Sequence, residues 1–525
     1  MIHNNSTSPI KRIAAIDLGT NSFHAVIVDI FSDGSFRKVD DLKEMVQLAK
    51  GGLGKRLADS AFKRGLSALQ KIKVLCDSQG VEKILAYATS AIREAENGGE
   101  FIQKSIDDLG IKINAIPGSM EAELIGYAVQ HGVRLNEEPV LMVDIGGGSV
   151  EFILGNNKEF FFLTSRKIGV SRMTDIFKPC DPITKEDIAK LEEHYLNELK
   201  EVEDALKVNP TKTIIGSSGT MQNIALMIAN RKNQSTNVTL NELEFSAGDF
   251  FKFYSDFIKL NHKQRLHVSG LDTKRVDFVN TGVVLVNLLI SKFGVDKIKI
   301  STQALREGII IRYLKKDMIG IPWAGEFTDP RRRSVFELLR KCNWHEDHSR
   351  HVAKLSLILF SSLKEALSLK EEDRELLEYA AYLHDIGYYI SHSAHHKHAL
   401  YIIRNADLLG FRQEEIEMIA NIARYHRRST PKKRHGEYWK MPAQIRSRIK
   451  KLSAILRVAD GLDRSHYQNV QELNVKVLEK ELLLTIKTMD EPHLEIWGAT
   501  RKSFLMKEIL NKKLVINRVV SDKDE

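Results

Sequence analysis

Two short glycine-containing turns carry residues that could bind phosphate. In each turn an Asp is followed two residues later by Gly and three residues after that by Ser. The first turn contains Asp17, Gly19, Thr20, Asn21 and Ser22, and the second contains Asp144, Gly146, Gly147, Gly148 and Ser149. Glycine lets backbone N–H groups approach a phosphate, and the polar side chains add donors. One such turn is typical of a plain hairpin, but the matched pair predicts two loops that clamp successive phosphates across a cleft.

A third glycine turn follows a strand-like segment and leads into a helix near Met221. Its residues are Gly216, Ser217, Ser218, Gly219 and Thr220. A helix N-terminus presents unpaired N–H groups to an anion, so this turn is a further candidate for binding phosphate.

Three acids lie close to these turns. Asp144 begins the second turn, Glu151 follows it on the next strand-like run, and Glu121 follows a Pro-Gly turn. Carboxylates beside bound phosphates can hold Mg²⁺ or activate an attacking water. From the residues alone, Asp144 could equally be a turn-forming Asp, and Glu121 a first-turn acid that interacts with the helix dipole.

A later segment with helical spacing is dense in histidine. An adjacent His384–Asp385 pair, with distant His348 and Asp460, could surround one divalent metal with nitrogen and oxygen ligands. The alternative is that these are core histidines with ordinary hydrogen-bond partners.

The elements around these residues alternate between strand and helix, which predicts an α/β architecture. Strands are expected within Ile13–Ile30 and Val140–Leu154, on either side of the two turns, and the repetition indicates a duplicated domain. Further strands are expected at Ile84–Ala88, Ile111–Ile116 and Lys297–Ile300, and helices at 57–79, Ala91–Arg93, near Glu121 and around 304–308.

The remainder of the chain is predicted to be mainly helical, with strands returning near the end. Residues 321–333 are expected to be a linker, and 334–463 to be helical. The tail is expected to hold strands at Leu473–Val477, Leu482–Ile486, His493–Trp497 and Lys513–Arg518, with a helix at Ser503–Leu510.

Composition narrows the class of protein. Hydrophobic residues make up 43% of the 525, and no apolar run approaches the roughly 20 residues of a membrane helix. Three separated cysteines and a polar N-terminus favour the cytoplasm. The net charge of +9 suits an anionic partner, although the basic runs Arg331–Arg333 and Arg427–Arg434 are each expected to be solvated surface. No motif predicts specific nucleic-acid binding.

Several strings, taken together, resemble the exopolyphosphatase/guanosine pentaphosphate phosphohydrolase (Ppx/GppA) family. They are IDLGTNSFHAVIVD, YATSAIREA, IPGSMEAELI, VDIGGGSVEF, IGSSGT and STQALREGI, in this order between residues 13 and 312. The resemblance implies two ribonuclease-H-like domains of the actin/Hsp70/sugar-kinase superfamily, at 1–132 and 133–321. The later segment resembles an all-α HD-type domain, at 322–468, followed by a small α+β domain at 469–525.

The resemblance also implies roles for single residues. Glu121 would activate the attacking water, Asp144 and Glu151 would assist through Mg²⁺ or Mn²⁺, and Arg93 would bind a substrate phosphate. Pro117 stands where members of the family often have Ser, which we expect to alter the turn but not to remove the acid.

The resemblance to an HD-type domain implies a second divalent metal there. Its ligands would be His348, His384, Asp385 and Asp460, with His396, His398 and His426 lining a phosphate pocket. His351 is the alternative to His348, although the sequence that follows favours His348.

These features predict an exopolyphosphatase that removes terminal phosphate from inorganic polyphosphate. Conversion of pppGpp to ppGpp is the alternative within the same chemistry. A phosphate-chain or nucleotide sensor without turnover is an alternative of another class. The family resemblance further implies a homodimer.

Overall fold

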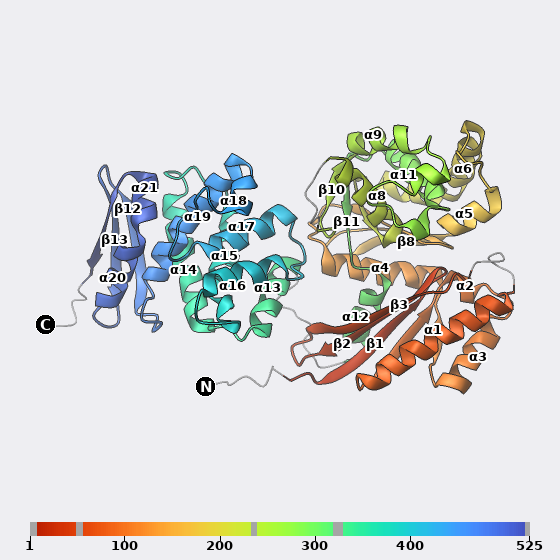
Figure 1. Cartoon of the computed structure of the whole chain (residues 1–525), viewed down its shortest axis with the longest axis horizontal. Helices are drawn as coiled ribbons and strands as arrows, with labels where there is room; N and C mark the ends of the chain where they lie inside the picture. Colours follow the sequence, from red (N-terminus) through yellow and green to blue (C-terminus); the bar gives the residue numbers. More distant parts are fainter. Residues whose placement is uncertain (1–7, 49–55, 233–238, 319–328, 520–525) are drawn as a thin grey trace. The chain divides into compact units, whose positions relative to one another are not determined.

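The computed structural model describes residues 8–48, 56–232, 239–318 and 329–519 (Figure 1). The chain forms two compact units, Met1–Pro330 and Arg331–Glu525. Within the described residues, no helix is long and apolar enough to span a bilayer.

The first unit begins with a five-stranded sheet in the order β3-β2-β1-β4-β5. Its strands are β1 (Lys11–Leu18), β2 (Ser22–Ile30), β3 (Phe36–Met45), β4 (Lys83–Ala88) and β5 (Ile113–Ala115). In β1, Ala14 and Ile16 belong to one hydrophobic cluster, while Ile13 and Ala15 belong to another. Alternate residues point to opposite faces of a strand, so an apolar run of this kind needs cover on both faces. Helices α1 (Asp59–Ser78) and α3 (Gly98–Leu109) cover one face.

A second sheet repeats this arrangement and adds one edge strand. Its order is β10-β11-β9-β6-β7-β8. The strands are β6 (Val140–Ile145), β7 (Val150–Gly155), β8 (Phe160–Arg166), β9 (Thr213–Ser217), β10 (Glu244–Ser246) and β11 (Lys297–Ile300). The order β8-β7-β6-β9-β11 matches β3-β2-β1-β4-β5 of the first sheet, so the predicted duplication is confirmed.

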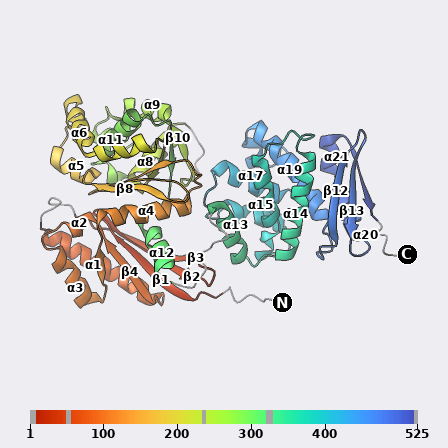
Figure 2. The ribbon, with the colours of Figure 1, turned by 180° about the vertical axis from the view of Figure 1, so that it is seen from behind.

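The other helices of this unit pack on or between the two sheets (Figure 2). They are α2 (Ser90–Arg93), α4 (Gly118–Gly132), α5 (Val170–Phe177), α6 (Lys185–Glu198), α7 (Lys200–Val208), α8 (Ser218–Arg231), α9 (Ala247–Phe257), α10 (His262–Arg265), the 3-10 turn η1 (Thr273–Arg275), α11 (Val279–Phe293) and α12 (Leu305–Lys316). Helices α4 and α12 share one hydrophobic cluster with residues of both sheets. They approach so closely that a Cβ at Gly308 would lie 1.9 Å from the Leu124 carbonyl oxygen. This packing fixes α4, which carries Glu121.

Helices dominate the second unit. They are α13 (Pro330–Lys341), α14 (Glu346–Leu363), α15 (Glu372–Leu383), the 3-10 turn η2 (Ile386–Tyr389), α16 (His395–Arg404), α17 (Gln413–Arg424), α18 (Gly436–Lys440) and α19 (Ala443–Gly461). A sheet in the order β12-β13-β14 follows, formed by β12 (Val470–Val477), β13 (Glu481–Thr488) and β14 (Lys513–Arg518), with helices α20 (His493–Lys502) and α21 (Phe504–Leu510).

The strand predicted at His493–Trp497 is wrong, because this segment begins α20. Its buried residues are Glu495, Gly498 and Ala499, while Leu494 and Trp497 are exposed. Burial therefore follows the helical period, and the short alternation of apolar residues was misleading.

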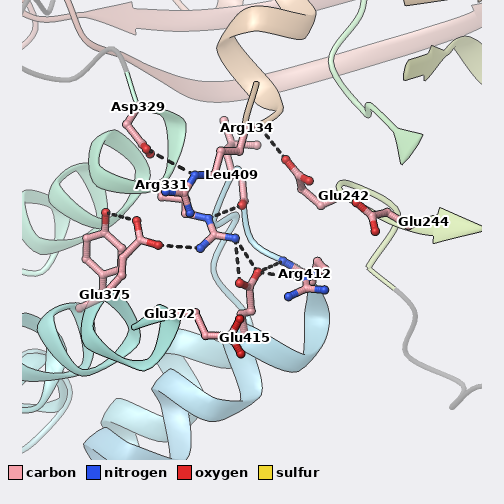
Figure 3. Close-up of polar contacts among 12 residues, drawn as sticks. Arg134, Glu242, Glu244, Asp329, Arg331, Glu372, Glu375, Leu409, Arg412 and Glu415 are labelled. Carbon is pink, nitrogen blue, oxygen red and sulfur yellow. Dashed lines mark hydrogen bonds and ion pairs between the residues drawn. The ribbon is translucent and has the colours of Figure 1, made fainter. Parts of the chain in front are cut away.

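Two of the three arginines in the basic run at the start of α13, Arg331 and Arg333, are buried and so are neither linker nor solvated surface. Of the predicted linker, residues 321–328 lie outside the described residues, and Pro330–Arg333 form the first turn of α13, with Pro at a position that helices favour. Arg331 is buried and lies between two carboxylates (Figure 3). Its guanidinium donates to Glu415 at 2.7 Å, to Glu375 at 2.8 Å and to the Gly410 carbonyl at 2.7 Å. A basic run can thus hold a core together.

Replacing Arg331 by Met should lower the free energy of unfolding of the second unit by about 3–5 kcal/mol, because Glu415 would stay buried with only Arg412, 3.6 Å away, as a counter-ion. Arg332→Met is the matched control, since Arg332 is 37% exposed and pairs with Glu378 at 3.4 Å. We expect the control to lose about 1 kcal/mol or less. Urea unfolding measures both variants, and equal losses would contradict the buried role of Arg331.

Candidate active site

A cavity of about 180 Å³ lies in the first unit and is lined by residues of both duplicated halves. Most of the phosphate-binding and catalytic residues predicted from the sequence line it. They are Asp17, Gly19, Thr20, Asn21, Ser22, Glu121, Asp144, Gly146, Gly147, Gly148, Ser149, Glu151, Ser218, Gly219 and Thr220. Segments far apart in the sequence therefore meet here, as the paired turns predicted.

The two Asp-Gly turns approach each other closely. A Cβ at Gly148 would lie 2.9 Å from Oγ1 of Thr20 and 2.2 Å from Oγ of Ser90. A Cβ at Gly147 would lie 2.8 Å from Nδ2 of Asn21. Glycine at these two positions leaves room between the turns, and hydroxyl and amide donors border that space.

Asp144 and Glu151 face each other across the β6–β7 hairpin. They are direct partners in the antiparallel register, which places both side chains on one face of the sheet. Asp144 accepts a hydrogen bond of 2.5 Å from Ser217, and Glu151 accepts one of 2.8 Å from Ser165. Burial raises the pKa of Asp144 to about 6, and burial with the Asp144 carboxylate raises the pKa of Glu151.

Glu121 lies in the first turn of α4 and is buried. Its Oε2 accepts a hydrogen bond of 3.2 Å from Arg93, which also donates to the Ile116 carbonyl at 2.7 Å. Burial, and then the carboxylate of Glu151, raise the pKa of Glu121 well above its ordinary value. Arg93 is not among the residues that line the cavity but contacts the Glu121 carboxylate there, and its role in binding a substrate phosphate stays a prediction.

Three cations line the cavity that the sequence did not single out: Lys43, Arg275 and Arg306. Burial lowers the pKa of Lys43 and of Arg275, since each side chain loses contact with water. Arg306 contacts His24 and lies in the family-like string STQALREGI, which was the available signal for it. Lys43 and Arg275 stand in no motif.

Helix N-termini add to the positive potential. The first residues of α5, α8 and α12, namely Val170, Ser218 and Leu305, all line the cavity. Gly216 and Ser217 do not line it, because they are still part of strand β9. Ser217 instead supports Asp144 through its hydroxyl.

Four carboxylates converge on this cavity. Glu121, Asp144 and Glu151 are buried, and Asp17 is half-buried. Loss of contact with water raises the pKa of Asp17 to about 7, so the group is costly to ionise without a cation nearby. Carboxylate oxygens together with phosphate oxygens are the ligands that Mg²⁺ prefers. This donor set fits a divalent cation bound together with a phosphate.

A second cluster of ligand-type side chains lies inside the helical part of the second unit. One group is His348, His384 and Asp460, and the other is Asp385, His395 and His426, with the ligand atoms of each group within 4.8 Å of one another. All six side chains are buried. Burial lowers the pKa of His384, which keeps its imidazole in the neutral form that binds metals.

The structure brings together the four metal ligands expected here from the sequence, together with His426. Between the alternatives for the first ligand, His348 lies in the cluster and His351 lies outside the two groups. His395, which the sequence did not single out as a ligand, belongs to the second group. His396 and His398 are in neither group, and their predicted place in a phosphate pocket stays a prediction. Helix α16 begins at His395, directly after Ala394 in the left-handed conformation. This start of the helix determines that His395 is the residue that faces Asp385.

Two family models together match most of the chain. A model of the Ppx/GppA phosphatase family matches residues 26–317, and a model of Ppx/GppA phosphatase domain III matches residues 331–503. The chain is 28% identical over 488 residues, 92% of each chain, to a guanosine-5'-triphosphate,3'-diphosphate pyrophosphatase of Photobacterium profundum.

Two solved structures resemble more than half of the chain. An exopolyphosphatase from Cytophaga hutchinsonii is 31% identical with a TM-score of 0.55, over 58% of this chain and 98% of that one. A Ppx/GppA family member from Aquifex aeolicus is 26% identical with a TM-score of 0.51, over 59% and 99%. The predicted pair of actin-like α/β domains is thereby confirmed. The chain belongs to the Ppx/GppA phosphatase family and is a phosphoanhydride hydrolase.

Proposed function

We propose that the enzyme removes the terminal phosphate of inorganic polyphosphate by water attack in the cavity of the first unit. The observation that carries this proposal is the position of Glu121, a buried carboxylate that faces the cavity between the two glycine turns. A carboxylate whose pKa is raised accepts a proton from water more readily than an ordinary one.

Each group around the cavity has a part in this proposal. The turns at Asp17 and Asp144 bind the last phosphates through N–H and hydroxyl groups, and Arg93 orients Glu121. Glu121 takes a proton as the water oxygen bonds to the terminal phosphorus and the P–O bond to the chain breaks. The products are orthophosphate and a chain one unit shorter.

Asp144 and Glu151 are the proposed ligands for Mg²⁺ or Mn²⁺. The bound cation would neutralise charge on the phosphate oxygens and on the leaving chain. Lys43, Arg275 and Arg306, which also line the cavity, would attract the same anionic groups.

Two observations favour different substrates. Among the described residues that line the cavity, none is Phe, Tyr or Trp, and the one imidazole, that of His24, contacts Arg306, so no large aromatic side chain is available to stack on guanine. This favours polyphosphate. The similarity to a guanosine-5'-triphosphate,3'-diphosphate pyrophosphatase over 92% of the chain favours pppGpp as the second candidate.

The rest of the chain is assigned in the same proposal. The domains are 1–132, 133–321, 322–468 and 469–525. The enzyme is a cytoplasmic homodimer. The HD-type domain binds one divalent ion, and its ligands are His348, His384, Asp385 and Asp460. Free Cys76, Cys180 and Cys342 support a reducing compartment.

Orthophosphate release from long-chain polyphosphate and from pppGpp, with Mg²⁺, tests the choice of substrate. We expect kcat/KM to be higher for polyphosphate by about tenfold or more. A preference for pppGpp would select the second candidate. Tight binding of either substrate with no release would instead indicate a sensor.

A further inference from the structure

Asp385 lies between two sets of histidines. Its Oδ2 is 3.5 Å from Nε2 of His384 and 3.7 Å from Nε2 of His348. Its Oδ1 is 3.2 Å from Nε2 of His395 and 3.5 Å from Nε2 of His426. Each carboxylate oxygen therefore faces a different pair of imidazole nitrogens.

These spacings fit ligands that share an ion. Nitrogen and oxygen ligands lie about 2.1 Å from a bound metal, so two ligands of a tetrahedral ion are separated by about 3.4 Å. On the Oδ2 side, Asp460 adds a further oxygen, 3.9 Å from Nε2 of His348. The side of Oδ1 has the same spacing but no second carboxylate among the described residues of the two groups.

Hydrogen bonds from the Nδ1 atoms orient three of these imidazoles, so that each Nε2 faces the proposed ion. Nδ1 of His384 donates to the Ala381 carbonyl at 2.7 Å, and Nδ1 of His426 donates to the Ala423 carbonyl at 2.6 Å. Nδ1 of His348 is 2.7 Å from a carboxylate oxygen of Asp463. Such contacts hold Nε2 as the free lone pair.

Two of these lone pairs have no hydrogen-bond partner within the described residues. They are Nε2 of His348 and Nε2 of His384, and both are buried. A buried polar atom without a partner costs free energy of folding, so a bound ligand is expected at each of the two nitrogens. A metal ion satisfies both nitrogens at once.

We propose that the HD-type domain holds two divalent ions bridged by Asp385, which extends the one-ion site of the proposed function. The first ion is bound by His348, His384, Asp460 and Oδ2 of Asp385. The second ion is bound by His395, His426 and Oδ1 of Asp385, and its three protein ligands leave positions open for water or substrate. Mixed imidazole and carboxylate ligands suit Mn²⁺, Fe²⁺ or Zn²⁺ better than Mg²⁺.

Charge indicates the class of ligand for the open positions. Two divalent ions carry four positive charges. The two ligand carboxylates, Asp385 and Asp460, cancel two of them, and Asp463, 2.7 Å from Nδ1 of His348, cancels a third. Lys502 pairs with Asp460, and Arg427 lies 3.0 Å from Nε2 of His395, a contact that it gives up when the ion binds. The excess positive charge and these two basic side chains select an anion, and we assign a phosphate-bearing ligand.

Metal content of the full-length protein tests the proposal. The chelated protein is reloaded with Mn²⁺ in excess Mg²⁺, so that Mg²⁺ fills the carboxylate site of the first unit and Mn²⁺ fills the sites with imidazole ligands. It is then dialysed and measured by elemental analysis and by electron paramagnetic resonance. We expect two Mn²⁺ per chain with the exchange-coupled spectrum of a bridged pair. His426→Ala should bind one ion with an uncoupled spectrum. His351→Ala, a buried histidine outside the groups, should keep two, and so should Asp144→Asn, which alters only the cavity of the first unit.

Each other result has a defined meaning. One uncoupled ion in the wild type would overturn the two-ion proposal and leave the one-ion site standing. No bound ion would overturn both. Orthophosphate release by the wild type is measured in parallel, so a failure of the active-site proposal in the first unit shows separately. Thermal unfolding of metal-free His426→Ala should match that of metal-free His351→Ala, since a bound ion itself stabilises the fold. Two coupled ions in a folded His426→Ala protein would overturn the assignment of the second set of ligands.

Discussion

Replacing Glu121 by Gln should slow orthophosphate release by about 10²–10⁴-fold, the usual contribution of a general base. The amide keeps the size of the side chain but cannot accept the proton of the attacking water. Substrate affinity should change little, because the Glu121 carboxylate bonds to Arg93 and not to a residue of the two glycine turns that bind phosphate. Steady-state kinetics on polyphosphate would therefore show the loss in kcat and leave KM close to the wild-type value.

Glu123→Gln is the matched control for this variant. Glu123 lies on the same helix, two residues further on, and bonds to Tyr127 at 3.0 Å outside the cavity. We expect it to retain wild-type activity. Equal activity of Glu121→Gln and Glu123→Gln would remove Glu121 from the mechanism, whatever the site of the chemistry.

Replacing Asp144 by Asn should reduce kcat/KM by about 100-fold or more and raise the Mg²⁺ concentration needed for half-maximal rate. The change removes one charge from the proposed metal site, while Ser217 can still bond to the amide oxygen. A titration of the rate with Mg²⁺ measures both effects.

Asp204→Asn controls for a general effect of losing a carboxylate. Asp204 is 72% exposed and pairs with Lys207 on helix α7. It should leave the Mg²⁺ dependence unchanged. If Asp144→Asn showed the wild-type dependence on Mg²⁺, the metal would have to be held elsewhere.

The features that could be predicted from the sequence are local ones. The turns at Asp17 and Asp144 each span only a few residues, and the apolar runs on either side of each turn predict a hairpin. The spacing of Asp, Gly and Ser was therefore enough to match one turn with the other.

The residues that the sequence did not reveal come from separate elements. Lys43 lies on β3 and Arg275 in η1, and only the packing of the two halves brings them to one cavity. His395 and His396 are adjacent, and the start of α16 decides which one faces Asp385. Arg331 looked like surface because its partners, Glu375 and Glu415, are distant in the sequence.

The most direct test of the active site is a crystal structure of the Glu121→Gln variant with a short polyphosphate and Mg²⁺. We predict the terminal phosphate between the turns at Asp17 and Asp144, with the substituted amide at position 121 facing the phosphorus through a water and the cation beside Asp144. A phosphate chain bound outside this cavity, with the two glycine turns empty, would contradict this mechanism.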